Sequence, residues 1–258
     1  MLKYSKANSK LEELIQVVEL RQFLEGKRKV YSLDLLSGFS CPYAKDCLSK
    51  VVEKDGKRTL VDGPHTLFRC FSASQEVQYT NTYNLRKGNF EAVKGLSVVE
   101  MFEAIRAAMP KNLGICRIHV AGDFFSQNYF DAWVMMAKAH PDRLFYAYTK
   151  SLTYWLRRRD DIPENLVLTA SFGGRLDNKI ETEKLRSSVV VYSVQEAIDK
   201  GLEIDHTDEH AAIPSTRDQD FALLIHGTQP KGSDAGAAIK ELKAKNVKFS
   251  YSRKVVNA

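Results

Sequence analysis

Short apolar runs rich in β-branched residues alternate with amphipathic helical runs along most of the chain, and this alternation limits the fold more than any other feature of the sequence. It is typical of a mainly parallel sheet with helices packed on it. The predicted strands are residues 30–36, 115–121, 143–149, 165–171, 188–193 and 221–226. The clearest predicted helices are residues 97–109, 126–140 and 233–245, with Ser126 able to cap the second. The predicted fold class is therefore α/β.

The length of the chain favours a single domain. With 258 residues, 44% of them hydrophobic, the chain can bury one large core. Residues 1–258 are therefore predicted to form one α/β domain with a cysteine-bearing loop at residues 38–72. A complete or partial (β/α) barrel and an open doubly wound sheet both fit the alternation. In either architecture ligands collect at the carboxyl ends of the strands, so we expect the site there.

Composition excludes several classes of protein. The amino-terminal residues are charged and helical in pattern, unlike a secretory signal, and no window approaches the roughly 18 apolar residues of a membrane span. The formal net charge of +6 is scattered except at Arg157–Arg159, so it does not demand a nucleic-acid partner. We expect a protein of the reducing cytoplasm with no membrane partner and no need for nucleic acid.

Three of the four cysteines follow the first predicted strand. Cys41, Cys47 and Cys70 have the spacing C-x5-C-x22-C and share one long polar loop at that strand's carboxyl end. A disulfide is disfavoured in the cytoplasm, and the spacing of a zinc ribbon is missing, although zinc held by cysteines and a histidine stays an alternative. Converging thiolates suit an iron–sulfur cluster at least as well. The remaining alternative is that all four cysteines are small buried hydrophobes.

A family resemblance adds to this interpretation. The runs "CPYAKDC", "RCFSAS", "RIHVAGDFFSQNYFDAW", "FYAYTKS" and "LTASFGG" resemble the phage-encoded "gene product eighty-eight" family over most of residues 30–175. The resemblance implies an iron–sulfur protein on a scaffold similar to the radical S-adenosylmethionine (radical SAM) barrels, with metal ligands at Cys41, Cys47 and Cys70. The chain lacks the C-x3-C-x2-C spacing of the radical enzymes, so S-adenosylmethionine is only a second candidate cofactor.

Cys116 is predicted not to join the other three cysteines. It begins a strand that ends near Gly122, and at about 3.3 Å per residue it should lie roughly 15 to 20 Å from the carboxyl end where the loop gathers. We therefore expect Cys116 in the core. A [4Fe–4S] cluster bound by the three loop cysteines would then have a fourth iron with a non-cysteine ligand.

Polar residues at the end of the same strand are candidates for a cofactor or ligand pocket. Alternation predicts that Arg117, His119 and Asp123 share the face opposite Cys116. Tyr146, Tyr148 and Lys150 alternate in the same way on the next strand. The alternative for Gly122 and Asp123 is a plain turn in which Asp123 caps the helix that begins near Ser126. Farther on, the acidic, histidine-containing loop at residues 203–220 is expected to be solvated, and the alternative is a hard-metal site at His206, Asp208, Glu209 and His210.

The function predicted from the sequence is that of a cytoplasmic iron–sulfur protein with one [4Fe–4S] cluster, acting in electron transfer or small-ligand binding. One alternative is a cluster-dependent, radical-SAM-like enzyme acting on a small substrate or nucleotide. The other is a zinc-stabilised nucleic-acid-binding phage protein. The partner is expected to be a redox protein or a small molecule, and the sequence leaves the oligomeric state and the question of enzymatic activity open.

Overall fold

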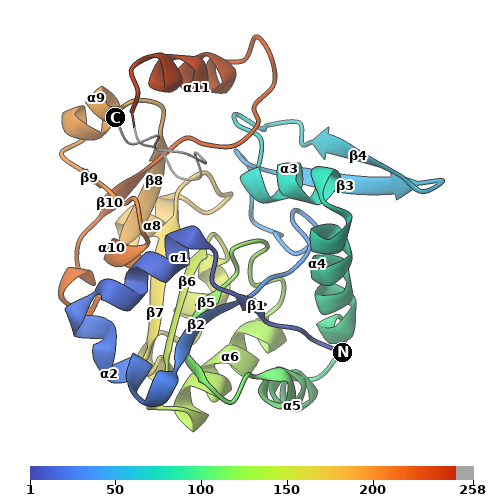
Figure 1. Ribbon diagram of the computed structural model, residues 1–258, viewed down its shortest axis with the longest axis vertical. Helices are drawn as coiled ribbons and strands as arrows, with labels where there is room; N and C mark the ends of the chain where they lie inside the picture. Colours follow the sequence, from blue (N-terminus) through green and yellow to red (C-terminus); the bar gives the residue numbers. More distant parts are fainter. Residues whose placement is uncertain (248–258) are drawn as a thin grey trace.

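The computed structural model describes residues 1–247, and its centre is an eight-stranded sheet (Figure 1). The predicted domain extends to residue 258, so residues 248–258 lie outside the described part. In spatial order the strands are β1 (Ser5–Lys6), β2 (Lys29–Leu33), β5 (Leu113–Ile118), β6 (Leu144–Thr149), β7 (Leu166–Ser171), β8 (Ser187–Val191), β10 (Phe221–Leu224) and β9 (Glu203–Ile204). All six predicted strands are present, each of them shorter than predicted.

The sheet is parallel except for its first strand. β1 pairs with β2 in the antiparallel sense, and the strands from β2 to β10 are parallel to their neighbours. These six central strands follow one another in chain order, whereas the order in a doubly wound sheet reverses at its centre. Among residues 1–247 no pairing joins β9 to β1, so the sheet is not closed. The α/β class is confirmed, and the structure shows no barrel closure.

Helices connect the strands, and serine side chains cap the amino ends of four of the described helices. The helices are α1 (Ser9–Glu12), α2 (Arg21–Leu24), α3 (Phe71–Gln78), α4 (Thr80–Val93), α5 (Val98–Ala108), α6 (Gln127–Ala139), α7 (Leu152–Leu156), α8 (Asn178–Thr182), α9 (Val194–Asp199), α10 (Glu209–Ala212) and α11 (Asp234–Ala244). The Ser126 side chain accepts from the Tyr129 N–H at the start of α6, as predicted, and Ser97 forms a capping box with Glu100 at the start of α5. In the described part of the chain no helix combines the length and apolar character needed to cross a membrane.

One face of the sheet packs against α5 and α6. Cys116 and Ile118 of β5 lie in this layer with Phe145 of β6, and α6 contributes the fully buried Phe130 and Trp133. Burial of each large apolar side chain stabilises the fold by about 1.5–3 kcal/mol. This layer is an apolar and aromatic core, and it accounts for the strong helical periodicity of α6.

The other face is apolar near the amino ends of the strands and polar near their carboxyl ends. Val30, Ile115 and Leu144 pack there against Leu14 from the amino-terminal segment and Ala212 from α10. The segment that carries α1 and α2 therefore covers this half of the sheet (Figure 1). The candidate site lies toward the carboxyl ends of the strands on this face, where Lys10 of α1 is part of its lining.

The long loop after β2 contains a hairpin that the sequence interpretation missed. Strands β3 (Ser49–Lys54) and β4 (Lys57–Asp62) pair in the antiparallel sense and project from the body (Figure 1). Asp55 and Gly56 form the turn with positive φ angles of 51° and 72°. An Asp-Gly pair between two strand-forming runs is a strong hairpin signal, so the sequence did carry this information.

Candidate functional site

Cys41, Cys47 and Cys70 are half-buried free thiols in the loop at the carboxyl end of β2. Burial raises the pKa of Cys41 well above its ordinary value, and the neighbouring Asp123, Cys70 and Cys47 raise it further. Burial and then Cys47 raise the pKa of Cys70 to about 11. Because Cys47 and Cys70 disfavour ionisation of Cys41, and Cys47 also disfavours that of Cys70, the three are electrostatic neighbours. The fold brings together cysteines that span 30 residues of sequence.

Backbone contacts hold this loop against the ends of other strands. The N–H groups of Lys45 and Asp46 donate to the carbonyl of Gly173 after β7, at 3.1 and 3.0 Å. Gly122, after β5, has φ +93°, and a Cβ there would lie 2.6 Å from Ser40 Oγ. The turn at Gly122 therefore lets Ser40, next to Cys41, approach the sheet more closely than a side chain at residue 122 would allow.

A buried carboxylate links the two parts of the cysteine loop. Glu76 on α3 is fully buried, and its Oε1 accepts from the Ser37 hydroxyl at 2.7 Å and from the Ser37 N–H at 3.1 Å. Arg86 of α4 pairs with the same oxygen at 3.2 Å. Since Ser37 lies four residues before Cys41 and α3 starts right after Cys70, Glu76 fixes the position of one cysteine segment relative to the other. Sequence reasoning missed this residue.

The start of α3 partly offsets the effect of burial on Cys70. Cys70 is the residue before the first turn of that helix, and the N–H groups of Ala73 and Ser72 lower its pKa. Helix amino ends favour negative charge in this way. Burial prevails, so the pKa of Cys70 stays raised. The Cys41 and Cys70 thiols therefore remain protonated near neutral pH unless a cation stabilises their thiolates.

Among residues 1–247 no group of three or more His, Cys, Asp or Glu side chains is arranged to hold one metal ion. The zinc alternative and the iron–sulfur cluster both stay predictions.

A cavity of about 190 Å³ lies beside the cysteines. Cys47 and Cys70 form part of its wall. Arg117 of β5 and Tyr148 of β6 form another part, and His226, which follows β10, also lines it. The full lining is Lys10, Cys47, Phe68, Cys70, Phe71, Ser72, Arg117, Val120, Tyr148, Asp205, His206, Asp208, Leu223, Leu224 and His226. Two of the three loop thiols therefore border the same space as charged groups from the sheet.

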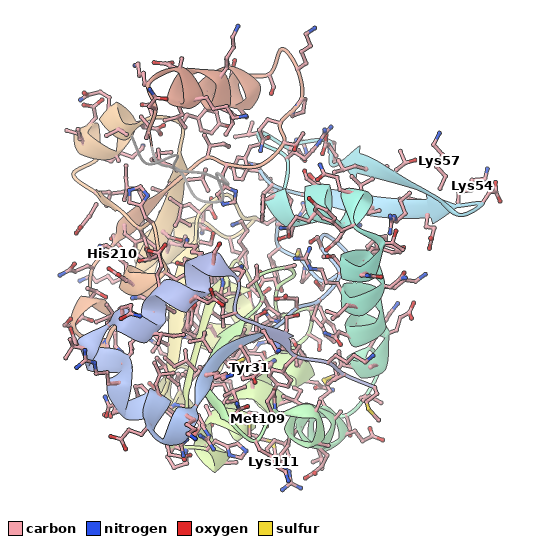
Figure 2. The ribbon with its side chains drawn as sticks, viewed as in Figure 1. Tyr31, Lys54, Lys57, Met109, Lys111 and His210 are labelled. Atoms are coloured by element: carbon pink, nitrogen blue, oxygen red, sulfur yellow. The ribbon has the colours of Figure 1, made fainter. Side chains whose placement is uncertain are left out.

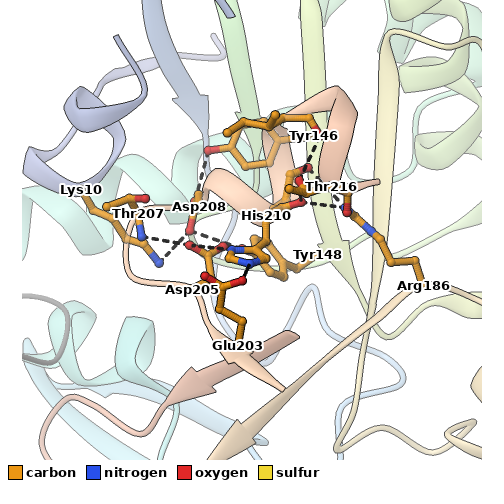
Figure 3. Close-up of polar contacts among 12 residues, drawn as sticks. Lys10, Tyr146, Tyr148, Arg186, Glu203, Asp205, Thr207, Asp208, His210 and Thr216 are labelled. Atoms are coloured by element: carbon orange, nitrogen blue, oxygen red, sulfur yellow. Dashed lines mark hydrogen bonds and ion pairs between the residues drawn. The ribbon is translucent and has the colours of Figure 1, made fainter. Parts of the chain in front are cut away.

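Asp208 is the centre of the polar network in this cavity (Figure 3). It is fully buried and accepts from Lys10 Nζ at 2.7 Å, Tyr146 Oη at 3.1 Å and Tyr148 Oη at 3.3 Å, and it pairs with Arg117. Burial alone would raise its pKa, but Arg117 and Lys10 lower it to about 2. Asp208 is therefore a carboxylate at neutral pH. It joins the amino-terminal segment to β5 and β6.

The loop that carries Asp208 corrects a prediction made from the sequence. Residues 203–220 were expected to be solvated, yet Asp205 and Asp208 are buried and His210 is nearly so. His210 Nε2 lies 3.1 Å from a carboxylate oxygen of Glu203, and Asp205 accepts from the Thr207 N–H at 2.9 Å (Figure 3). Burial and then Asp208 raise the pKa of Asp205. No local pattern in the sequence indicates that Lys10 and Arg117, far away in the chain, compensate the charge of Asp208.

Arg117, His119 and Asp123 were predicted to share the pocket face of β5, but only Arg117 lines the cavity. Arg117 lines the cavity and lies 4.9 Å from the centre of the Tyr148 ring. The prediction for His119 is wrong, because β5 ends at Ile118 and His119 has φ +69°, which breaks the alternation. Its ring packs against Phe124 and lies 3.2 Å from Tyr129 Oη, and burial lowers its pKa to about 3.

Asp123 is buried near Cys41 but neither lines the cavity nor caps α6. It accepts from the Thr149 hydroxyl at 2.6 Å and the Lys150 N–H at 2.9 Å, so it ties the end of β5 to the end of β6. The proposed capping role is therefore wrong, since Ser126 makes that bond. Burial is the largest influence on the pKa of Asp123 and raises it.

Cys116 lies in the apolar layer under α6 and is fully buried. Burial and then Asp34 raise its pKa, with no contribution from the loop cysteines. It also does not line the cavity that Cys47 and Cys70 border. The predicted core position of Cys116 is thus the position that the structure shows.

Comparison with known proteins identifies the family of the chain. The Gene product 88 family matches residues 3–247, which is nearly the whole sequence. No curated protein and no solved structure matches the chain. The matched range includes the cysteine loop, the sheet and the Asp208 network. The chain therefore belongs to the Gene product 88 family.

Proposed function

We propose that this protein binds one [4Fe–4S] cluster through Cys41, Cys47 and Cys70 and acts in electron transfer or in binding a small ligand beside that cluster. The observation that carries the proposal is the meeting of three half-buried thiols at the carboxyl end of a parallel sheet, next to a charged cavity. A bound cluster would supply one-electron chemistry and, at the iron without a cysteine, an open position.

The protein residues around the thiols suit this cofactor. N–H groups at the start of α3 face Cys70, and such donors stabilise cluster sulfurs and tune their potential. The raised pKa values of Cys41 and Cys70 mean that the thiolates need a compensating cation. An iron–sulfur core would provide that positive charge in the same place.

The cavity favours a small ligand over S-adenosylmethionine. Its volume of about 190 Å³ lies below the roughly 300–1,000 Å³ of typical pockets for drug-sized ligands. Arg117 and Lys10 supply positive charge on its wall, Asp208 supplies negative charge, and Tyr148 supplies a hydroxyl. In this proposal those groups orient the ligand and hold its polar atoms away from bulk water.

A cluster-dependent enzyme is the second candidate. The buried Asp208 network supports it, because ionisable groups shifted by burial and charge partners often lie at catalytic sites. The one-way strand order supports a partial barrel similar to that of the radical enzymes. The zinc-stabilised nucleic-acid-binding alternative rests on the net charge and on the run Arg157–Arg159. We further propose that the protein works in the cytoplasm of a phage-infected host cell.

Anaerobic purification followed by iron, acid-labile sulfide and zinc assays tests the proposal. We expect about four iron and four sulfide atoms per chain and visible absorbance typical of a [4Fe–4S] cluster. Full-length protein that contains stoichiometric zinc and no sulfide would favour the zinc alternative. Protein that stays free of iron and sulfide after anaerobic reconstitution would refute the iron–sulfur proposal.

A further inference from the structure

The cysteine loop also forms one side of an exposed groove whose chemistry is not explained by the cluster site. The groove has a volume of about 340 Å³ and lies between the β3–β4 hairpin and α4. Its lining is Leu36, Phe39, Val51, Val52, Glu53, Tyr83, Lys87, Phe90, Glu91 and Lys94. The cavity described above shares none of these residues.

The centre of the groove is apolar and partly open to solvent. Phe39 and Val52 are 43% and 45% exposed, and beneath them lie Tyr83 and Phe90, which are buried. Both exposed apolar side chains line the same groove, and apolar surface gathered in a groove with a polar rim is a feature of interaction sites.

Basic side chains surround that centre. Lys50 lies 5.1 Å from the centre of the Phe39 ring, Lys87 lies 5.6 Å from that of Tyr83, and Lys94 lies 5.8 Å from that of Phe90. The Arg58 guanidinium is 5.3 Å from the Tyr83 ring. Lys54 and Lys57 project from the tip of the hairpin into solvent (Figure 2). An apolar centre with a basic rim complements an acidic protein that has an apolar contact patch of its own.

We propose that this groove docks a small acidic electron-carrier protein that exchanges electrons with the cluster. The inference rests on the proposed function, because Phe39 stands two residues before Cys41, within about 7 Å along the chain. Redox partners form small, transient interfaces in which charge steers the encounter and a modest apolar patch makes contact. The groove has both features at the part of the surface nearest to the thiols in sequence.

The same residues count against a nucleic acid as the partner. Glu53 and Glu91 also line the groove, and Glu53 lies 3.5 Å from Lys87. Carboxylates in the middle of the rim would repel a phosphate backbone, whereas a folded acidic partner can place its own positive groups opposite them. A basic stripe without acidic interruptions would be expected for DNA or RNA.

The test is titration calorimetry of full-length protein with flavodoxin, a small acidic electron carrier, at low and physiological salt. We expect saturable binding that weakens as salt increases. The double substitution Lys87→Glu with Lys94→Glu should weaken it by about tenfold or more, and Lys87→Gln with Lys94→Gln by less. The matched control Lys240→Glu with Lys243→Glu, on exposed positions of α11, should change it by less than about twofold.

Absence of saturable binding to the wild type, or equal losses in both charge-reversed proteins, would overturn the docking proposal. Tighter binding of a DNA duplex than of flavodoxin at this groove would do the same. Iron and sulfide are assayed in the same samples, so the two proposals fail separately. If the protein contains the cluster but does not bind flavodoxin, the docking proposal is refuted. If the protein binds flavodoxin but contains no cluster, the iron–sulfur proposal is refuted.

Discussion

Cys116 and Arg117 are consecutive residues of β5, and they lie in opposite environments. Cys116 is fully buried among the aromatic side chains of the layer under α6. Arg117 faces a cavity and pairs with the buried Asp208. The first face is stabilised mainly by apolar burial, whereas the second contains charges whose removal from water is costly. A buried ion network is a poor source of stability, so we infer that the second face is retained for function.

The largest expected effect follows from removing the charge at the centre of that second face. Asp208→Asn leaves Lys10 and Arg117 close together without their shared carboxylate, and loss of one partner of a buried ion pair costs about 3–5 kcal/mol. Urea unfolding would measure the loss of stability. The matched control is Asp160→Asn at an exposed position, which should change the free energy of unfolding by less than about 0.5 kcal/mol.

The pH dependence of stability in wild type and Asp208→Asn tests whether the charge of Asp208 causes this difference. The pKa of folded Asp208 is about 2, below the ordinary value of about 4. The contribution of the ionised carboxylate to stability is therefore complete above pH 4 and is lost as pH falls toward 2. We expect the stability difference between wild type and Asp208→Asn to narrow across that range. A difference that stays constant from pH 6 to pH 2 would show that the charge of Asp208 is not its cause.

A smaller effect is expected at the carboxylate that fixes the cysteine loop. Glu76→Gln keeps an acceptor for Ser37 but removes the charge that pairs with Arg86, both side chains being almost fully buried. We expect a loss of about 1.5–3 kcal/mol, the value typical of a hydrogen bond to a charged group, together with faster reaction of the loop thiols with a thiol reagent. Glu103→Gln is the control, since it breaks a Glu–Arg pair that is about half exposed. That variant should lose less than about 1 kcal/mol and leave thiol reactivity unchanged.

Gly122→Ala tests how closely the cysteine loop must approach the sheet. The new Cβ would lie 2.6 Å from Ser40 Oγ and 2.9 Å from Leu35 Cβ, in addition to the strain of φ +93°. We expect a loss of about 2 kcal/mol in thermal or urea unfolding. Gly95→Ala isolates the strain, because Gly95 has φ +83° and open space around it, and this change should cost about 1 kcal/mol. Equal losses in the two variants would mean that the contact with the loop is unimportant.

The sequence predicted the parts of the fold that depend on local pattern. Periodicity located α6, the Ser126 cap and all six central strands, and the position of Cys116 followed from counting residues along β5. The predicted side of His119 was wrong because its positive φ ends the alternation of side chains along β5. Residues 118 and 120 are not glycines, so the sequence contains no local signal for this turn of the backbone. Asp208 was missed because its two cations come from residues 10 and 117. When the cations that neutralise a carboxylate come from distant parts of the chain, the sequence around that carboxylate contains no sign of them.

Cys116 lies in the apolar layer under α6, whereas Cys70 lines the cavity that Arg117 faces on the other side of the sheet. The most direct test of this contrast is the iron and sulfide content of Cys70→Ala and Cys116→Ala, each purified without oxygen beside the wild type. We expect Cys116→Ala to keep the wild-type content and lose about 1 kcal/mol of stability, because Cys116 acts as a small hydrophobe in the core. Cys70→Ala should retain almost no iron or sulfide. Full iron and sulfide in Cys70→Ala, or their loss in Cys116→Ala, would contradict the account.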